Sequence, residues 1–195
     1  MNKDIVAKFK AKHGREWFGD LRADAILLFK KGENKYNVRK YDLSTDTKNL
    51  YVWLNEESLE KFDEVTGTSF RIMEFLNKPM LVAYMDREHS KYGEESRRLH
   101  AILKRVAKDY NKIIISFSEI DDYRSQKVQM GITWNEEPAI GVHNISNKGI
   151  PIYPRSVPFT EKNIRVFIEA CLSGVINMNE IDFPELNEKE SNEDL

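Results

Sequence analysis

The spacing of hydrophobic and polar residues divides the chain into short apolar runs and longer segments with helical periodicity. Apolar runs over residues 79–85 (PMLVAYM) and 112–120 (KIIISFSEI) have the length and continuity of buried strands. The segment between them predicts a helix over residues 94–110. Its expected buried face consists of Leu99, Ile102, Leu103, Val106 and Tyr110.

Further elements are predicted on both sides of this unit. A short helix over residues 67–77 can be capped by Thr68 or Ser69, and Lys78-Pro79 ends it. After the second strand we expect a small helix at 125–131, a strand at 139–145, a turn at 146–149, a strand at 150–154 and a closing helix at 160–176. This order gives an α/β fold with a mixed sheet covered by helices on both faces, which is the order of the thioredoxin fold.

Residues 1–57 predict a helix, a hairpin and a second helix. A basic helix extends to about Phe18, and residues 47–62 again have a helical pattern. The hairpin joins the apolar stretch Ala25–Phe29, through the turn residues KGEN, to a return strand with Tyr36, Val38 and Tyr41. Two strands and two helices leave a sheet edge unpaired, so this segment makes a poor independent domain.

The composition bounds the class of protein. The chain has 195 residues, of which 32% are charged and 41% hydrophobic, as expected of a globular domain or of one domain with part of another. No apolar run approaches the roughly 20 residues that cross a bilayer, and the N-terminus lacks the apolar stretch of a secretory signal. The segment from Glu180 to Leu195 has seven acidic residues and one lysine, a charge of −6. Since the total is −2, the body carries +4, too little for a nucleic-acid surface.

The residue types that commonly carry chemistry are few and scattered. The single cysteine, Cys171, excludes an internal disulfide and a multi-cysteine zinc site. We interpret it as a buried apolar residue because it shares a predicted helix face with Ile164, Phe167, Ile168, Leu172 and Val175. The histidines lack ligand-like spacing, so no metal site is expected. They are His13, His89, His100 and His143.

Several of these segments together resemble the b-prime domain of the protein disulfide isomerase family. The matching segments, in order and spacing, are KPMLVAYMD, the helix ending in VAKDY, KIIISFSEIDD, WNEEPAIGVHN and FTEKNIRVFIEACLSGVI. The resemblance covers about residues 59–176, and the hairpin of the first segment is similar to the last two strands of a b domain. It implies a partial b-like thioredoxin domain at 1–57, a b-prime-like thioredoxin domain at 58–178 and an acidic tail at 179–195.

The catalytic domains of that family carry Cys-x-x-Cys where a strand runs into the next helix. An ungapped reading of this chain places His89 and Tyr92 at those two positions. Thiol-disulfide exchange needs a thiolate and a resolving partner within bonding reach, and the chain supplies neither at this turn. The b and b-prime domains of the family are redox-inactive, so the resemblance implies a binding domain that is not an enzyme and needs no cofactor.

The resemblance also implies two binding surfaces. In the family an apolar groove between the first and third helices of b-prime holds unfolded polypeptide, and the matching residues are Phe62, Phe70, Met73, Val128 and Met130. Ordinary core packing is the alternative for each of them. A branch of the family also uses a basic b-prime surface to contact the acidic arm of calnexin or calreticulin. The cationic residues of the predicted helix over 94–110 are Arg97, Arg98, Lys104, Arg105 and Lys108, for which a solvated helix face is the alternative.

One proline occupies a position that is informative in this fold. Pro138 precedes the predicted strand at 139–145, where thioredoxin-like proteins carry a cis proline. We therefore expect a cis bond between Glu137 and Pro138, with an ordinary trans proline at the start of an edge strand as the alternative.

The sequence thus predicts a non-catalytic thioredoxin-like module that binds unfolded polypeptide or a chaperone partner during protein folding in the endoplasmic reticulum lumen. The missing signal and the half b domain suggest a fragment of a longer multidomain protein. The last four residues, NEDL, resemble the KDEL class of retention signals, and the sequence leaves retention and a chance ending of an acidic tail equally open. The alternative class is a calsequestrin-like calcium-storage or scaffold protein, although a +4 body lacks the acidic surface that this role requires.

Overall fold

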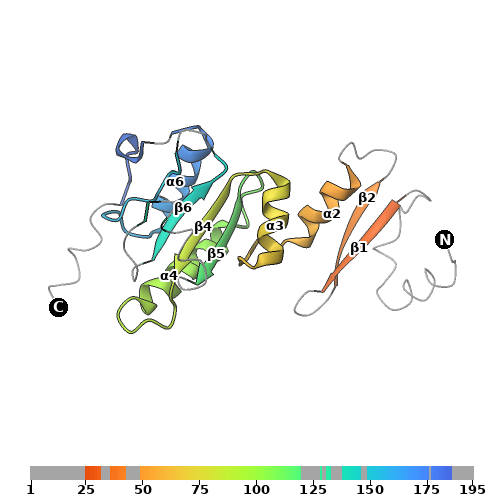
Figure 1. Ribbon diagram of the computed structural model, residues 1–195, viewed down its shortest axis with the longest axis horizontal. Helices are drawn as coiled ribbons and strands as arrows, with labels where there is room; N and C mark the ends of the chain where they lie inside the picture. Colours follow the sequence, from red (N-terminus) through yellow and green to blue (C-terminus); the bar gives the residue numbers. More distant parts are fainter. Residues whose placement is uncertain are drawn as a thin grey trace. The chain divides into compact units, whose positions relative to one another are not determined.

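The computed structural model describes residues 25–31, 36–42, 49–119, 128, 131–132, 138–145, 149–175 and 177–185. The chain divides into two compact units, Met1–Ser58 and Leu59–Leu195, each with its own sheet (Figure 1). The first unit contains β1 (Ala25–Lys31), β2 (Tyr36–Asp42) and α2 (Leu50–Ser58). The second contains β3 (Phe62–Glu64), α3 (Gly67–Leu76), β4 (Met80–Met85), α4 (Gly93–Val106), β5 (Ile114–Glu119), β6 (Ala139–His143), α6 (Glu161–Leu172) and the 3-10 helix η2 (Met178–Glu180). None of the described helices is both long and apolar enough to span a bilayer.

The first unit contains the predicted hairpin. Strands β1 and β2 pair antiparallel from Ala25 opposite Asp42 to Lys31 opposite Tyr36. Tyr41 is buried, and its ring lies 5.3 Å from that of Trp53 on α2. No residue of α2 is fully buried. The predicted helix that extends to about Phe18 lies outside the described residues.

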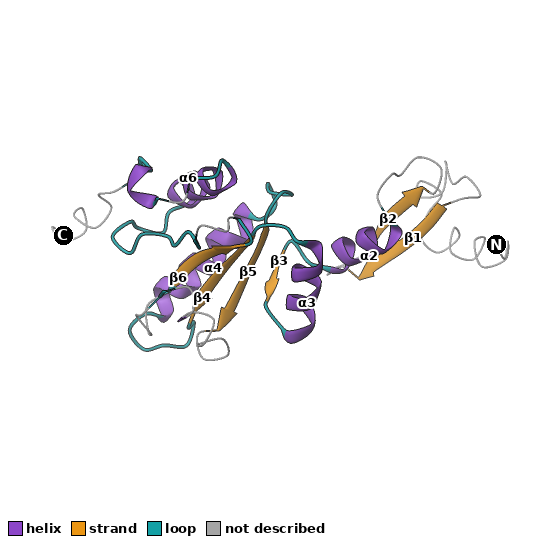
Figure 2. Ribbon diagram, turned by 45° about the horizontal axis from the view of Figure 1, so that its top comes forward, coloured by secondary structure: helices purple, strands orange, loops and turns teal. Residues whose placement is uncertain are grey.

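The second unit has the predicted mixed sheet, with the strand order β3-β5-β4-β6 (Figure 2). Strands β3 and β4 both run parallel to β5, and β6 runs antiparallel to β4. The strand expected at residues 150–154 is reduced to a single bridge between Ile152 and Gly141. Because Pro151 and Pro154 have no N–H group to donate, this edge segment cannot form a longer regular ladder.

The boundary between α2 and β3 corrects one prediction. The helical pattern of residues 47–62 predicts helix up to Phe62, but α2 ends at Ser58 and Phe62 begins β3. The ring of Phe62 packs 5.2 Å from Phe117 and 5.0 Å from His100, and its backbone pairs with β5. These contacts, distant in sequence, override a local helical pattern.

The start of α3 corrects the prediction of its capping residue. Thr66 caps this helix, not Thr68 or Ser69. Its hydroxyl accepts a hydrogen bond from the backbone N–H of Ser69 at 3.1 Å, and the hydroxyl of Ser69 accepts one from the backbone N–H of Thr66 at 2.7 Å. Asn77 ends the helix in the left-handed conformation, with φ of 48°. This reciprocal cap, in which serine takes the usual place of Glu or Gln, fixes where α3 leaves the sheet.

The sheet separates two hydrophobic clusters. Alternate residues of β4 belong to each: Leu81, Ala83 and Met85 pack with α4 and α6, whereas Met80, Val82 and Tyr84 pack with Met73 of α3. Helices α4 and α6 bury six and five residues respectively, and α3 buries only Met73. The α4 and α6 side is therefore the main core of the second unit.

A C-terminal segment is attached to this core. The side chain of Asn163 donates hydrogen bonds to the carbonyls of Pro158 at 3.2 Å and Glu185 at 2.7 Å, and accepts one from the N–H of Glu185 at 3.1 Å. Phe183 is buried with its ring 5.6 Å from Tyr153. Residues 179–185, which the charge pattern assigns to the acidic tail, are thus packed on the domain.

Replacing Asn163 tests this attachment. Asn163→Ala leaves backbone polar groups unsatisfied, so we expect a loss of about 2 kcal/mol in unfolding free energy and a fall of several degrees in Tm. Thermal unfolding followed by circular dichroism measures the change, with Asn179→Ala, at an exposed position of η2, as the control. Equal Tm values for the two variants would contradict the assignment.

Candidate functional site

The turn between β4 and α4 is the first candidate, because thiol chemistry in this fold takes place there. In this chain it contains His89 and Tyr92 and no cysteine. The single thiol, Cys171, is fully buried in α6, and burial raises its pKa to about 12. A thiol with that pKa supplies almost no thiolate at neutral pH, and with one cysteine the chain has no Cys-x-x-Cys pair.

His89 has a structural role in this turn. Its Nδ1 atom accepts hydrogen bonds from the backbone N–H groups of Lys91 and Tyr92, both at 3.1 Å. Tyr92 is the N-cap of α4 and makes no capping bond with its own side chain, and the imidazole holds the two residues that lead into the helix. The rings of His89 and Tyr92 also stack at 5.3 Å.

Arg87 fixes the other half of the turn. Its guanidinium donates to Glu119 at 2.6 and 2.8 Å and lies 5.0 Å above the ring of Phe117. The backbone carbonyl of Arg87 accepts a hydrogen bond from Arg97, and it would lie 2.8 Å from a Cβ atom added at Gly93. Only glycine fits so close to this carbonyl, and the turn is packed tightly against the start of α4.

The structure does not bring the five predicted groove residues onto one surface. Phe62 packs with His100 and Phe117 on the α4 side of the sheet, whereas Phe70 and Met73 belong to the α3 side. Met73 is 2% exposed and is therefore a core residue. Val128 is 59% exposed, and Met130 lies outside the described residues.

Helix α3 presents apolar surface that the sequence reasoning only partly identified. Phe75 is 48% exposed, although it was not among the expected groove residues. The partly buried or exposed apolar residues of this helix, here termed the α3 surface, are Phe70, Ile72, Phe75 and Leu76. The helical spacing could have indicated Phe75. Met73 is buried, and Phe70, three residues earlier, packs partly against the same cluster, so Ile72 and Phe75 lie on a different face of the helix. Ile132 packs in the same cluster as Met73, which places the segment near Val128 on this side of the sheet.

Most cations of the predicted basic face have partners within the domain. Arg97 donates to the carbonyl of Arg87, Arg98 donates to the carbonyl of Phe159 at 3.3 Å, and Arg105 pairs with Glu161 at 3.1 Å. Lys104 and Lys108 are exposed. The five residues do share α4 and its C-terminal extension, and of these only Arg105 pairs with a carboxylate among the described residues, that of Glu161.

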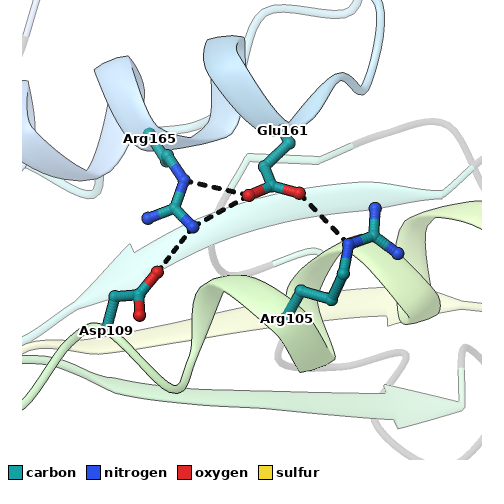
Figure 3. Close-up of polar contacts among 4 residues, drawn as sticks. All are labelled: Arg105, Asp109, Glu161 and Arg165. Carbon is teal, nitrogen blue, oxygen red and sulfur yellow. Dashed lines mark hydrogen bonds and ion pairs between the residues drawn. The ribbon is translucent and has the colours of Figure 1, made fainter.

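An ion-pair network joins α4 to α6 (Figure 3). Glu161, at the start of α6, accepts from Arg105 and, at 2.8 and 3.2 Å, from Arg165. Arg165 also donates to Asp109 at 2.6 Å. Hydrogen bonds from Arg165 and Arg105 hold the pKa of Glu161 below its ordinary value. Hydrogen bonds to Glu161 and Asp109 in turn raise the pKa of Arg165.

The α3 side of the sheet also contains a buried polar pair that the sequence did not indicate. The hydroxyl of Tyr84 lies 3.3 Å from Nε2 of His143. Burial raises the pKa of Tyr84 and lowers that of His143, so both are neutral near pH 7. Among the described residues no three His, Cys, Asp or Glu side chains gather as metal ligands.

Pro138 lies immediately before β6 and is buried. The expected cis bond involves Glu137, which lies outside the described residues. The isomer of this bond therefore stays a prediction.

Comparison with known proteins gives a family and a fold. Residues 8–170 match the family of the thioredoxin-like domain, which extends across both units. No curated protein matches the chain. The bb fragment of ERp72 superposes on 89% of this chain and 74% of its own, with a TM-score of 0.56 and 15% identity. Human ERp44 in its zinc-bound form matches with a TM-score of 0.46 and 14% identity. The match covers 72% of this chain and 40% of ERp44. The first two thioredoxin domains of Saccharomyces cerevisiae Eps1p match with a TM-score of 0.36 and 15% identity. The match covers 72% of this chain and 68% of the Eps1p chain.

The chain belongs to the thioredoxin-like domain family. Its fold resembles that of the bb fragment of ERp72, and this confirms the thioredoxin-like fold expected from the sequence. At 15% identity the structural match shows the shared fold, and the site residues of this chain must be argued from its own geometry.

The pKa of Glu161 gives a testable pH dependence. A folded-state pKa below the unfolded value means that ionised Glu161 contributes stability above the unfolded pKa, and that this stability is lost as the pH falls through the lower folded value. Glu161→Gln should therefore lower Tm at pH 7, and its difference from the unsubstituted chain should shrink below about pH 4. Thermal melts between pH 7 and 3 measure this, with the exposed Glu88→Gln as the control. A difference that stays constant with pH would refute the network's role.

Proposed function

We propose that this chain is a non-catalytic thioredoxin-like module that binds unfolded polypeptide during protein folding. The observation that carries the proposal is the apolar surface of α3. This ten-residue helix buries only Met73, while Phe75 remains 48% exposed and Phe70, Ile72 and Leu76 are partly exposed. Apolar surface left on one helix of an otherwise well-buried domain is typical of an interaction site.

The turn between β4 and α4 supports the same proposal. A thiol enzyme of this fold keeps a reactive group exposed there, whereas here the residues of the turn bond to one another and to the neighbouring helix. The scaffold of such a domain can then serve binding alone. Contacts with varied unfolded sequences need apolar area more than specific polar groups, and the α3 surface offers that area.

We further propose that the module works in the endoplasmic reticulum lumen, in line with its fold neighbour ERp72, which is a protein of that compartment. Calnexin or calreticulin remains a possible acidic partner of α4 within this proposal. We base the proposal on the α3 surface and not on α4, because Arg97, Arg98 and Arg105 make contacts within the domain.

A substitution on α3 tests the binding surface. Phe75→Ser should weaken binding of a permanently unfolded protein, such as reduced and carboxymethylated α-lactalbumin, by about three- to tenfold, because an exposed aromatic contact of roughly 1 kcal/mol is lost. Because the side chain is 48% exposed, the Tm of the variant is measured alongside, so that a loss of affinity can be told from a loss of folded protein. Fluorescence anisotropy with labelled polypeptide gives the affinity.

The matched control for this test is Tyr51→Ser, which removes another exposed aromatic side chain, 62% exposed, from α2 of the first unit. Its affinity should equal that of the unsubstituted chain. Equal losses in the two variants, or no loss in Phe75→Ser, would count against the α3 surface.

The absence of thiol chemistry has its own test. The purified chain should not accelerate the reduction of insulin by dithiothreitol, followed as turbidity, because its one thiol is buried and mostly protonated. Acceleration that disappears in Cys171→Ser would show that the chain is catalytic.

A further inference from the structure

One asparagine lies in a sequence pattern that accepts N-linked oligosaccharides. The transferase that attaches these glycans in the endoplasmic reticulum acts on Asn-x-Ser or Asn-x-Thr, in which x is not proline. Residues 144–146 read Asn-Ile-Ser, and Asn144 is the one asparagine of the sequence in such a pattern. Ser146 lies outside the described residues and contributes here through the sequence alone. The pattern therefore singles out Asn144, whose position the structure gives.

Asn144 lies in a bend directly after His143, the last residue of β6. Its φ angle is 55°, in the left-handed region where asparagine is enriched among the residues other than glycine. Its side chain is exposed, whereas the next residue, Ile145, is partly buried against the main core. The bend is thus anchored by Ile145 and presents the side chain of Asn144 to solvent, as a bulky, hydrated modification requires.

A left-handed asparagine alone would not indicate a glycan. The structure describes a second one, Asn77 with φ of 48°, which ends α3 and whose backbone N–H donates to the carbonyl of Glu74 at 3.0 Å. Asn77 is followed by Lys78 and Pro79, so it lacks the hydroxyl residue that the transferase requires. Turn geometry accounts for asparagine at both positions, but of the two only Asn144 also has the acceptor pattern.

The register of the sheet places Asn144 away from the turn between β4 and α4. Strand β6 runs antiparallel to β4, so Ala139 lies opposite Tyr84, near the end of β4 that leads into this turn. His143 lies opposite Met80, where β4 begins. Asn144 therefore follows β6 at the other end of the sheet, where an attached glycan displaces no side chain of the core.

We propose that Asn144 is the acceptor of an N-linked oligosaccharide. The inference rests on the location in the endoplasmic reticulum lumen that is part of the proposed function. The co-reactant is an oligosaccharide joined to a lipid through a pyrophosphate. The amide nitrogen of Asn144 forms a bond to C1 of the first sugar, and the bond between C1 and the pyrophosphate oxygen breaks. The lipid pyrophosphate leaves with the electron pair of that bond, and the amide nitrogen gives up one proton.

The test expresses the full chain behind a cleavable secretory signal in cultured eukaryotic cells, so that it enters the lumen whatever its natural location. Denaturing electrophoresis should show a heavier form that peptide-N-glycosidase F converts to the unmodified size. Ser146→Ala removes the pattern but leaves Asn144 in its bend, and Asn144→Asp removes the acceptor but keeps a residue that tolerates a positive φ. Both variants should lose the heavier form completely. The matched control, Ser146→Thr, keeps the pattern and should keep the heavier form.

An unmodified chain whose secretory signal has been cleaved would overturn the inference, as would a heavier form that persists in Ser146→Ala and Asn144→Asp. The natural protein, isolated from its own cells with an antibody, should show the same shift with the glycosidase. If it does not, although the secreted chain is modified, the proposed location is wrong and the inference falls with it. Binding of reduced and carboxymethylated α-lactalbumin by unglycosylated chain made in bacteria tests the polypeptide-binding proposal separately. Absence of that binding would overturn the proposed binding and leave the acceptor site standing.

Discussion

Burial of β4 on both faces and along both edges is the constraint on which the second unit depends. All six of its residues are buried, three against α4 and α6 and three against the α3 side, and its backbone pairs with β5 and β6. A strand in this position cannot shift by one residue without exchanging its two sets of side chains. The end of β4 is therefore fixed, and so is the turn from Asp86 to Tyr92 that follows it.

The contrast between the helices follows from the same sheet. Helices α4 and α6 cover the main core and are tied to each other by two ion pairs: Glu161 pairs with Arg105 on α4, and Arg165 pairs with Asp109 just after its end. α3 covers the other face through few buried contacts, of which Met73 is the centre. Apolar side chains of α3 can stay partly exposed because stability is supplied elsewhere. A partner that covers Phe75 would not need to disrupt the core.

The sequence predicted the elements with strong periodicity and failed where local and distant contacts compete. The apolar runs of β4 and β5 and the stripes of α4 and α6 bury enough area to decide their own structure, and each was confirmed. Phe62 was wrongly placed in a helix because its ring contacts, to His100 and Phe117, are made with residues far along the chain. The sequence also could not tell which side of the sheet Phe62 and Met73 occupy, and the structure places them in different hydrophobic clusters. The role of His89 in the turn also had no sequence signal, since its bonds go to the backbone N–H groups of Lys91 and Tyr92 and follow no known side-chain motif.

The attachment of the C-terminal segment has a mechanical consequence. One side chain, that of Asn163, holds both the N–H and the C=O of Glu185, so a pull on the chain beyond Glu185 loads these two hydrogen bonds simultaneously and not one after the other. Bonds loaded in parallel resist tension better than bonds that open in sequence. Force from a tethered cargo would thus reach the start of α6 before it could peel the last residues away from the domain.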